Sequence, residues 1–200
     1  MTTSAVPARP AHRPSRRMHI IESAMRQFAR VSFDDVTVGD IAEAAEMTPA
    51  AVYYHFAGKE QILLEGTRLF TNDLIEVARS GIDDELQIGE LMIQLFEYIR
   101  RRRTSASVYF INSAGLNLAL EAHRKIVRAE LTELFTVEAR QTRGRLTTAE
   151  AGVMGAALVS LLEVSAVSML SRDLTYKGLG ARRMPTVVAG LANRIVGLDA

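Results

Sequence analysis

Two tyrosines and a histidine follow one another at residues 53–55, in a segment that we predict to be a short helix. Val52 and Phe56 share one face of that helix, because residues four apart lie above one another. The opposite face then carries hydroxyl and imidazole groups and almost no charge. Such groups can form hydrogen bonds to phosphates and base edges, so the segment is suited to a groove of nucleic acid.

The helix that carries these side chains has a clear start. Thr48 can cap the free amides of the first turn, and Pro49 suits the first helical position because no hydrogen bond is lost there. In residues 38–45, apolar side chains recur at spacings of three and four and so share one helical face. These side chains are Val38, Ile41, Ala42 and Ala45. The pattern predicts two short helices with a tight turn and a common core.

Over residues 16–64 the chain resembles the N-terminal domain of the TetR family of transcriptional regulators. The matching positions are Thr37, Val38, Ile41, Ala42, Ala45, Met47, Thr48, Val52, Tyr53, His55, Phe56, Lys59 and Glu60. The resemblance implies an all-α protein in which a three-helix helix-turn-helix DNA-binding domain precedes a larger helical bundle for ligand binding and dimerisation. We expect a disordered basic arm over residues 1–15, the DNA-binding domain over 16–60 and the bundle over 61–200.

The same resemblance implies a function. The protein would be a cytoplasmic homodimer that regulates transcription as a repressor and leaves a palindromic operator on double-stranded DNA when a small hydrophobic effector binds. The expected contacts to base edges are Thr48, Ala50 and Tyr54, and those to phosphates are Thr37, Tyr53, His55 and Lys59. Pro49 begins the recognition helix, and Arg16 and Arg17 end the basic arm.

One position departs from the family pattern in a way that affects DNA binding. The turn between the two helices usually has a glycine where this chain has Glu46. A non-glycine residue in the left-handed region costs about 1 to 2 kcal/mol, and a carboxylate here would lie near the DNA. Glu46 therefore weakens binding unless the turn takes another route.

Basic residues gather at the start of the chain, although the net charge of the whole is only +1. The first thirty residues hold Arg9, Arg13, Arg16, Arg17, Arg26 and Arg30 against a single acidic residue, Glu22. Arginines in such an arm can reach phosphates or the minor groove. The alternative is a solvated tail, and the sequence leaves both interpretations open.

Composition excludes several classes of protein. The chain has 200 residues of which 48% are hydrophobic, which argues against a disordered protein, and it has no cysteine for disulfides or thiolate metal sites. The most apolar stretch, residues 151–170, is long enough to span a membrane, but Glu163 and three serines favour a buried helix. We therefore expect no membrane partner.

Helical patterns continue to the C-terminus, with no alternating strand pattern. Helices are predicted over residues 59–80, 84–102, 104–118, 120–144, 148–171 and 181–197, with turns at Gly81, Gly144, Gly178 and Gly180. By the resemblance, the last two helices form the dimer interface through Gly152, Ala156, Ser160, Val187, Leu191 and Ile195. The effector would meet Tyr98, Tyr109, Phe110, Asn112, Asn117 and His123.

Signatures of catalysis are scarce. No metalloprotease, nucleophile-elbow or phosphate-loop motif occurs, and His12, His19, His55 and His123 form no ligand set with nearby carboxylates, so we expect no enzyme activity, cofactor or metal. Residues 100–103 are four arginines, which form either a solvated helix end or the mouth of a site for an anionic effector. The rival classes are a helical interaction scaffold and a helical enzyme with a vestigial DNA-binding motif.

Overall fold

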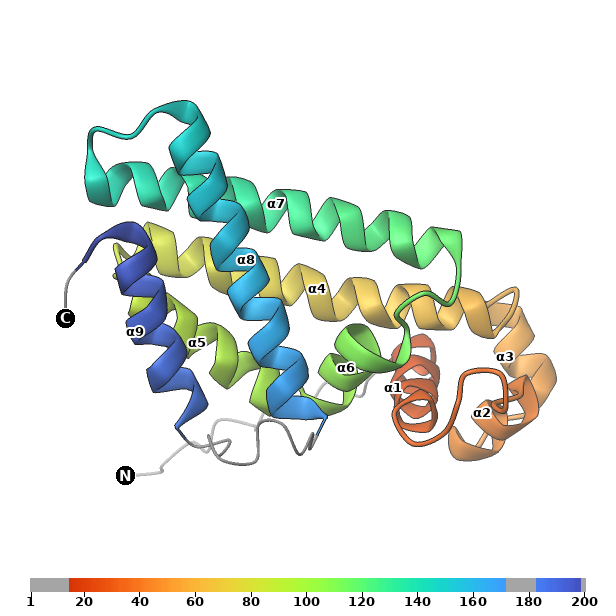
Figure 1. Ribbon diagram of the computed structural model, residues 1–200. Helices are drawn as coiled ribbons and strands as arrows, with labels where there is room; N and C mark the ends of the chain where they lie inside the picture. Colours follow the sequence, from red (N-terminus) through yellow and green to blue (C-terminus); the bar gives the residue numbers. More distant parts are fainter. Residues whose placement is uncertain (1–14, 172–182, 199–200) are drawn as a thin grey trace, which may run out of the picture.

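The computed structural model describes residues 15–171 and 183–198, and these residues fold into helices joined by short loops (Figure 1). The elements are α1 (Arg16–Phe28), α2 (Val38–Ala44), α3 (Pro49–His55), α4 (Lys59–Asp83), α5 (Ile88–Arg101), α6 (Arg103–Ser107), the π-helical turn η1 (Val108–Asn112), α7 (Leu118–Arg143), α8 (Thr148–Leu170) and α9 (Met184–Val196). The prediction of an all-α protein is confirmed.

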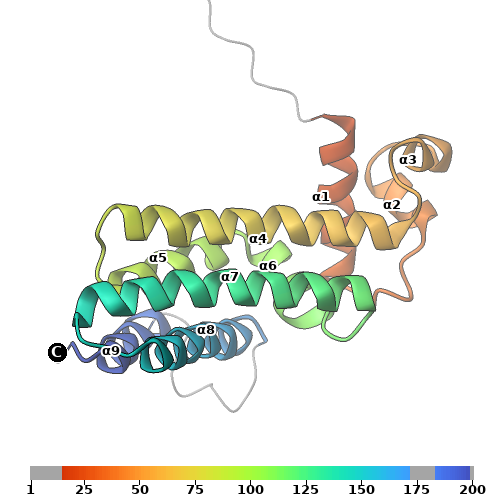
Figure 2. The same cartoon turned by 90° about the horizontal axis from the view of Figure 1, so that it is seen from above.

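Helices α1–α3 form a small head at one end of the molecule, and α4 runs from this head along the larger bundle (Figures 1 and 2). Phe28, Ile41 and Phe56 lie in the head core, together with Ile62 and Leu63 from the first turns of α4. The later turns of α4 belong to the bundle core. A single long helix therefore connects two separate cores.

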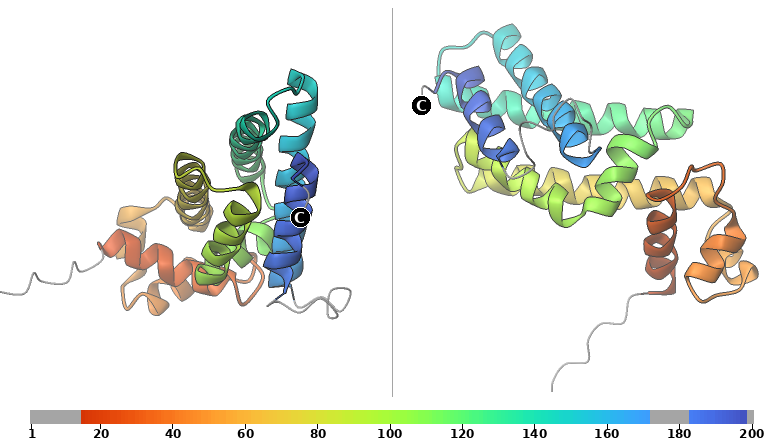
Figure 3. Two further views of the ribbon diagram at one scale, coloured as in Figure 1. Left: turned by 90° about the vertical axis from the view of Figure 1, so that its left-hand side faces the viewer. Right: turned by 60° about the horizontal axis from the view of Figure 1, so that its bottom comes forward.

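The bundle consists of α4, α5 and α7–α9. Helix α7 packs against both α4 and α8, and α9 packs against α5 and α8 (Figures 1 and 3). The largest buried side chains here come from different helices and include Leu74, Phe96, Phe135 and Leu158. Residues 1–14, 172–182 and 199–200, which include most of the predicted arm, Gly178 and Gly180, lie outside the described residues.

Two predictions about helix boundaries are wrong. Gly81 does not end a helix but lies within α4, where a Cβ atom would come within 2.6 Å of Leu91 Cδ1, so glycine lets α5 approach closely. The single helix predicted over residues 104–118 is instead α6, η1 and a loop. This loop contains Gly115 in the left-handed region and ends at Asn117, whose side chain caps α7.

Candidate nucleic-acid interface

The first helix of the motif, α2, starts at a capping box. Thr37 Oγ1 accepts a hydrogen bond from Asp40 N at 3.1 Å, and Asp40 Oδ2 accepts from Thr37 N and Oγ1 at 2.8 and 2.7 Å. Hydrogen bonds from the Thr37 side chain and backbone lower the pKa of the Asp40 carboxyl. Thr37 thus fixes the start of α2, and its side chain is exposed. Its hydrogen bonds also favour the ionised form of the Asp40 carboxylate.

The turn between α2 and α3 does require a left-handed residue. Glu46 has a φ of 54°. Its N–H donates to Glu43 O at 3.0 Å, and the N–H of Met47 donates to Ala42 O at 2.9 Å. These two bonds are the Schellman ending of a helix, which favours glycine at the position of Glu46. Glu46 therefore adopts the left-handed conformation, which is strained for a residue other than glycine, and its carboxylate is exposed beside α3.

Helix α3 is oriented as its apolar pattern predicts. Thr48 Oγ1 accepts from Ala51 N at 3.2 Å and caps the first turn. Val52 and Phe56 are buried in the head core, whereas the exposed fractions of Tyr53 and Tyr54 are 57% and 86%. The prediction that both tyrosines face outward is confirmed. Thr48, Pro49 and Ala50 are exposed as well, and His55 is half-buried.

The structure gives Arg17 a role that its sequence position did not predict. Its guanidinium donates to His55 O at 2.6 Å and to Glu65 Oε1 at 2.8 Å, and it lies 4.1 Å from the centre of the Phe56 ring. These contacts tie α1, the end of α3 and the start of α4 together. Arg17 therefore positions the recognition helix, whereas Arg16 is exposed on α1, and the phosphate contacts of both arginines stay predictions.

Lys59 is also a structural residue. Its ammonium donates to the carbonyl oxygens of Phe33, Asp34 and Val36 at 2.8, 3.2 and 2.8 Å, which uses all three of its protons. It also lies 4.5 Å from the centre of the Phe33 ring. Lys59 therefore holds the loop between α1 and α2 against α4, and its phosphate contact stays a prediction.

Together these elements present one surface, which we call the α3 face: Thr48, Pro49, Ala50, Tyr53, Tyr54 and the edge of His55. It lies at the end of the molecule away from α8 and α9 (Figure 2). Its side chains are short or aromatic, and three of them, Thr48, Tyr53 and Tyr54, carry hydroxyl groups. Beneath them the helix packs on the head core through Val52 and Phe56. Such a helix can enter a major groove, where hydroxyls reach base edges and phosphates.

Comparisons with known proteins agree with this geometry. Residues 20–65 match the family model described as bacterial regulatory proteins, tetR family. The HTH-type transcriptional repressor KstR2 of Rhodococcus jostii is 31% identical over 98 residues, which cover 47% of this chain and 48% of that protein. The chain thus spans about half the length of this curated relative.

Longer matches extend over the bundle. The HTH-type transcriptional regulator AcrR of Shigella flexneri is 27% identical over 157 residues, covering 69% of this chain and 72% of that protein. The structure of the fatty acid degradation regulator FadR from Bacillus halodurans superposes with a TM-score of 0.73 at 17% identity, covering 94% and 97% of the two chains. Residues 20–65 therefore form a DNA-binding domain of the TetR family of bacterial transcription regulators, a family of DNA-binding proteins that are not enzymes, and the bundle shares the fold of solved structures of this family.

The residues predicted to meet an effector divide into two groups. Tyr98, Tyr109 and Phe110 are buried around Phe70, with ring centroids 5.5 to 6.1 Å from it, and Tyr98 Oη donates to Phe70 O at 2.9 Å. Burial raises the pKa of Tyr109 to about 12. His123 is buried nearby.

His123 Nε2 lies 2.9 Å from Thr71 Oγ1, in the interface between α4 and α7. Burial and the charges of Arg68 and Arg124 lower the pKa of this imidazole. Asn112 is exposed and Asn117 caps α7, so neither belongs to the aromatic group. Phe70 and Thr71 were missed, because only the fold shows which side of α4 faces the aromatic rings.

The residues predicted for dimerisation lie mostly on one outer surface, which we call the α8–α9 face. Val153 is 70% exposed, and Val164, Val187 and Leu191 are exposed as well. A Cβ atom added at Gly152 or Gly190 would meet no atom within 4 Å. Ala156 is exposed and Ser160 half-buried on the same side, whereas Ile195 is half-buried and packs on the bundle core. Helix α8 has the length and mean hydropathy (1.9) of a membrane span, but half of this stretch is buried in the fold.

The four arginines at residues 100–103 are all exposed at the junction of α5 and α6. Arg102 Nη2 lies 3.6 Å from Asp73 Oδ2, and Arg103 donates to Leu170 O at 3.1 Å. Among the described residues there is no group of three His, Asp or Glu side chains that could hold a metal ion.

Proposed function

We propose that the protein is a homodimeric, ligand-responsive regulator of transcription that binds a palindromic operator through the α3 face and acts as a repressor. The observation that carries this proposal is the α3 face itself. Its two tyrosines are exposed, whereas Val52 and Phe56 on the other side of the helix are buried. Thr48, Ala50 and Tyr54 would contact base edges, and Tyr53 and His55 would contact phosphates. The target is DNA, so we place the protein in the cytoplasm.

Dimerisation is supported by the α8–α9 face, whose exposed valines and small residues could pack against a second copy. A two-fold axis through this face would present two α3 helices to one duplex. They must lie about 34 to 36 Å apart to enter successive major grooves. An inverted-repeat operator follows from this symmetry.

The response to a ligand would use α4 as a lever, because this helix belongs to both cores. A small hydrophobic effector that shifts α4 within the bundle would move the head, and the two α3 helices would lose their spacing. Couplings of this kind are typically worth about 1 to 3 kcal/mol. The aromatic group around Phe70 is the part of the bundle interior best suited to such a molecule.

Selection of genomic DNA fragments by the purified protein tests the proposal. We expect enrichment of an inverted repeat and binding that weakens steeply with salt. Light scattering in the absence of DNA should show a dimer at micromolar concentration. Recovery of random fragments, or a monomer with and without DNA, would contradict the proposal.

A further inference from the structure

A cavity of about 400 Å³ lies where η1 and the loop after it meet α7 and α8. Tyr109 and Phe110 of η1 line it, together with Val167 of α8. Its volume suits a small molecule, since ligand pockets usually measure about 300 to 1,000 Å³. Tyr109 and Phe110 also belong to the aromatic group around Phe70. The cavity therefore borders the part of the bundle interior that we propose for the effector.

The hydroxyl of Tyr109 is a buried donor without an acceptor. The residue is 4% exposed, and although its backbone oxygen accepts hydrogen bonds, its Oη has no partner among the described residues. Burial raises the pKa of Tyr109 to about 12, so the hydroxyl keeps its proton at neutral pH. Four charged side chains that line the cavity also act on this pKa: Arg124, Glu163, Glu121 and Arg128. The hydroxyl therefore lies on the cavity side of the ring, where a ligand can accept its hydrogen bond.

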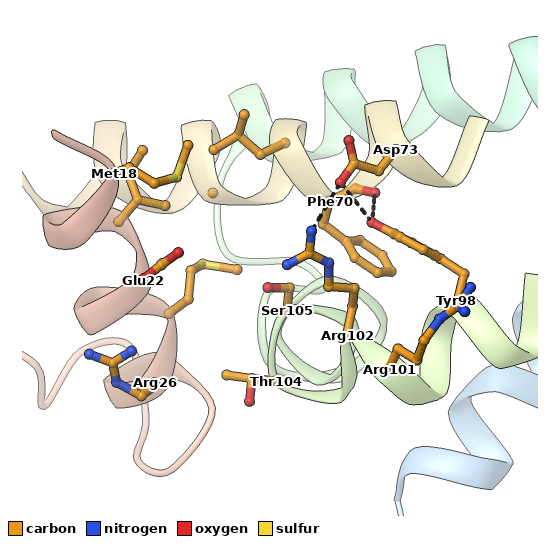
Figure 4. Close-up of a pocket in the computed structure, with 14 residues that line it drawn as sticks. Met18, Glu22, Arg26, Phe70, Asp73, Tyr98, Arg101, Arg102, Thr104 and Ser105 are labelled. Carbon is orange, nitrogen blue, oxygen red and sulfur yellow. Dashed lines mark hydrogen bonds and ion pairs between the residues drawn. The ribbon is translucent and has the colours of Figure 1, made fainter. Parts of the chain in front are cut away.

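Tyr98 differs from Tyr109 in this respect, although both tyrosines are buried beside Phe70. Figure 4 shows the Tyr98 hydroxyl directed toward Phe70 and Asp73. It donates to Phe70 O at 2.9 Å and lies 3.5 Å from Asp73 Oδ2. Of the two buried hydroxyls, that of Tyr109 is therefore the one that is free to bind a ligand.

The charged side chains of the cavity are paired with one another. Arg128 forms an ion pair with Glu163, and Arg124 Nε lies 3.5 Å from Glu121 Oε1. An ionic ligand of either sign would meet a like charge in each pair. Lys125 is the remaining charged residue of the lining, and it is exposed, so solvent and salt screen its charge. The cavity therefore favours an uncharged ligand that accepts a hydrogen bond.

We propose that this cavity, which we call the η1 cavity, binds the polar end of an uncharged carbonyl compound such as a ketone or ester, whose oxygen accepts a hydrogen bond from Tyr109 Oη. The apolar part of the molecule lies against Phe110 and Val167. This inference rests on the proposed regulatory function, because it names the chemistry of the effector that acts at the aromatic group.

The turn that carries Tyr109 also reaches the head. Val108, the first residue of η1, is fully buried in the head core, whereas Tyr109 and Phe110 belong to the bundle core. The turn packs against α1 as well as α8. Arg124 attaches it to α7, since its guanidinium donates to Tyr109 O and to Ser113 Oγ. A ligand that moves Tyr109 would therefore move Val108 as well, which gives the effector a second connection to the head beside α4.

The direct test compares two probes with one fluorescent ring system. The first, 2-acetyl-6-(dimethylamino)naphthalene, carries a ketone, and the second, 2-ethyl-6-(dimethylamino)naphthalene, has no acceptor at that place. Tyr109→Phe removes the hydroxyl and keeps the ring. We expect this variant to bind the ketone about three- to tenfold more weakly, as for one lost hydrogen bond, and the ethyl compound as well as the wild type does. An equal change for both probes, or no change for either, would overturn the proposal.

Tyr98→Phe is the matched control, because the hydroxyl that it removes is already bonded to Phe70 O. It should leave the ratio of the two affinities at the wild-type value. Emission of the bound ketone gives a second readout, since a hydrogen bond to its carbonyl shifts the emission to the red. Tyr109→Phe should therefore shift this emission to the blue, and Tyr98→Phe should not. The reverse pattern would place the ligand at Tyr98 and overturn the proposal.

Two charged probes test whether the ligand is uncharged. They replace the acetyl group of the ketone by a carboxylate or by a methylammonium group. Each should bind about tenfold or more weakly than the ketone, because it brings a like charge to one member of each ion pair. Tighter binding of either charged probe than of the ketone would overturn the assignment of an uncharged ligand.

Two variants locate the site. Ala114 lines the η1 cavity from an exposed position in the loop, so Ala114→Phe should fill the cavity and abolish binding of the ketone. Ala119→Phe is the matched control, because Ala119 is equally exposed at the start of α7 and does not line the cavity. Loss of binding in both variants, or in neither, would overturn the proposed site.

A last measurement separates this inference from the proposed function. Saturating ketone should weaken binding to the selected DNA by about fivefold or more. Ketone that binds as predicted to a protein with no DNA affinity would refute the regulatory function and leave the site intact. DNA binding that is insensitive to bound ketone would refute the assignment of the η1 cavity to the effector.

Discussion

Helices α3 and α8 both leave a largely uncharged face in water, in which α8 carries one charged side chain, Glu163, paired with Arg128. The two faces differ in kind. The α3 face carries hydroxyls and aromatic rings on a seven-residue helix that is held at both ends by hydrogen bonds. The α8–α9 face carries valines, alanine and glycine on a helix of 23 residues. Exposed tyrosines can exchange water for polar partners, whereas valines gain only by burial. This difference favours nucleic acid as the partner of the α3 face and a second copy of the chain as the partner of the α8–α9 face.

The largest effect is expected from a charge placed in the α8–α9 face. Ala156→Arg should produce monomers and weaken binding to an inverted repeat about 100-fold or more, because two linked half-sites reinforce each other. Light scattering and a DNA titration measure the two consequences. Ala129→Arg, on an exposed face of α7, is the control and should remain dimeric. A dimeric Ala156→Arg protein would remove this face from the dimer interface.

Truncation in the α3 face should leave the fold intact and affect DNA alone. Tyr54 is 86% exposed, so Tyr54→Ala should change the free energy of unfolding by less than about 0.5 kcal/mol. Its affinity for the operator should fall about tenfold, as expected for one lost contact to a base edge. Leu118→Ala, which removes an equally exposed side chain at the start of α7, serves as the control and should bind DNA normally. Equal affinities of the two variants would contradict the role of Tyr54.

Lys59 sharpens the comparison, because it lies beside α3 but faces the protein. Lys59→Ala leaves three carbonyl oxygens without their shared donor and should destabilise the fold by about 1 to 3 kcal/mol. Denaturant unfolding measures this change. Lys125→Ala, which truncates an exposed lysine on α7, should have almost no effect. A Lys59→Ala protein of full stability that binds all DNA sequences more weakly would restore the phosphate contact that the sequence predicted.

The smallest effect is expected at the turn before α3. Glu46→Gly should stabilise the fold by about 0.5 to 1 kcal/mol, since relief of left-handed strain exceeds the added entropy of the unfolded chain. Glu85→Gly is matched, because Glu85 has a φ of 57° and lies far along the chain at the end of α4. Both variants should gain stability in thermal unfolding. Tighter DNA binding is expected for Glu46→Gly and for Glu46→Gln, but not for Glu85→Gly; no gain in Glu46→Gln would show that the carboxylate does not repel DNA.

The DNA-binding head could be predicted from sequence because its signals are local. Threonine caps at residues 37 and 48, Pro49 and the spacing of Val52 and Phe56 act within single helices. Those features fix the direction of the α3 face without knowledge of the rest of the fold. The need for a left-handed residue at position 46 is local in the same way.

Long-range contacts could not be predicted in this manner. Arg17 and Lys59 look like free cations in the sequence, and only the packing of α1 and the loop before α2 brings carbonyl groups to them. Gly81 looks like a turn until α5 is placed beside it.

The central claim is that the outward side chains of α3 read bases in the major groove. Selection from a random DNA library, performed with the wild-type protein and with Tyr54→Ala, tests it most directly. We expect the wild type to select an inverted repeat whose halves are centred about 34 to 36 Å apart, or one turn of the duplex, and Tyr54→Ala to lose preference at one equivalent base in each half. The same repeat with the same preferences from both proteins, or no repeat from either, would contradict the claim.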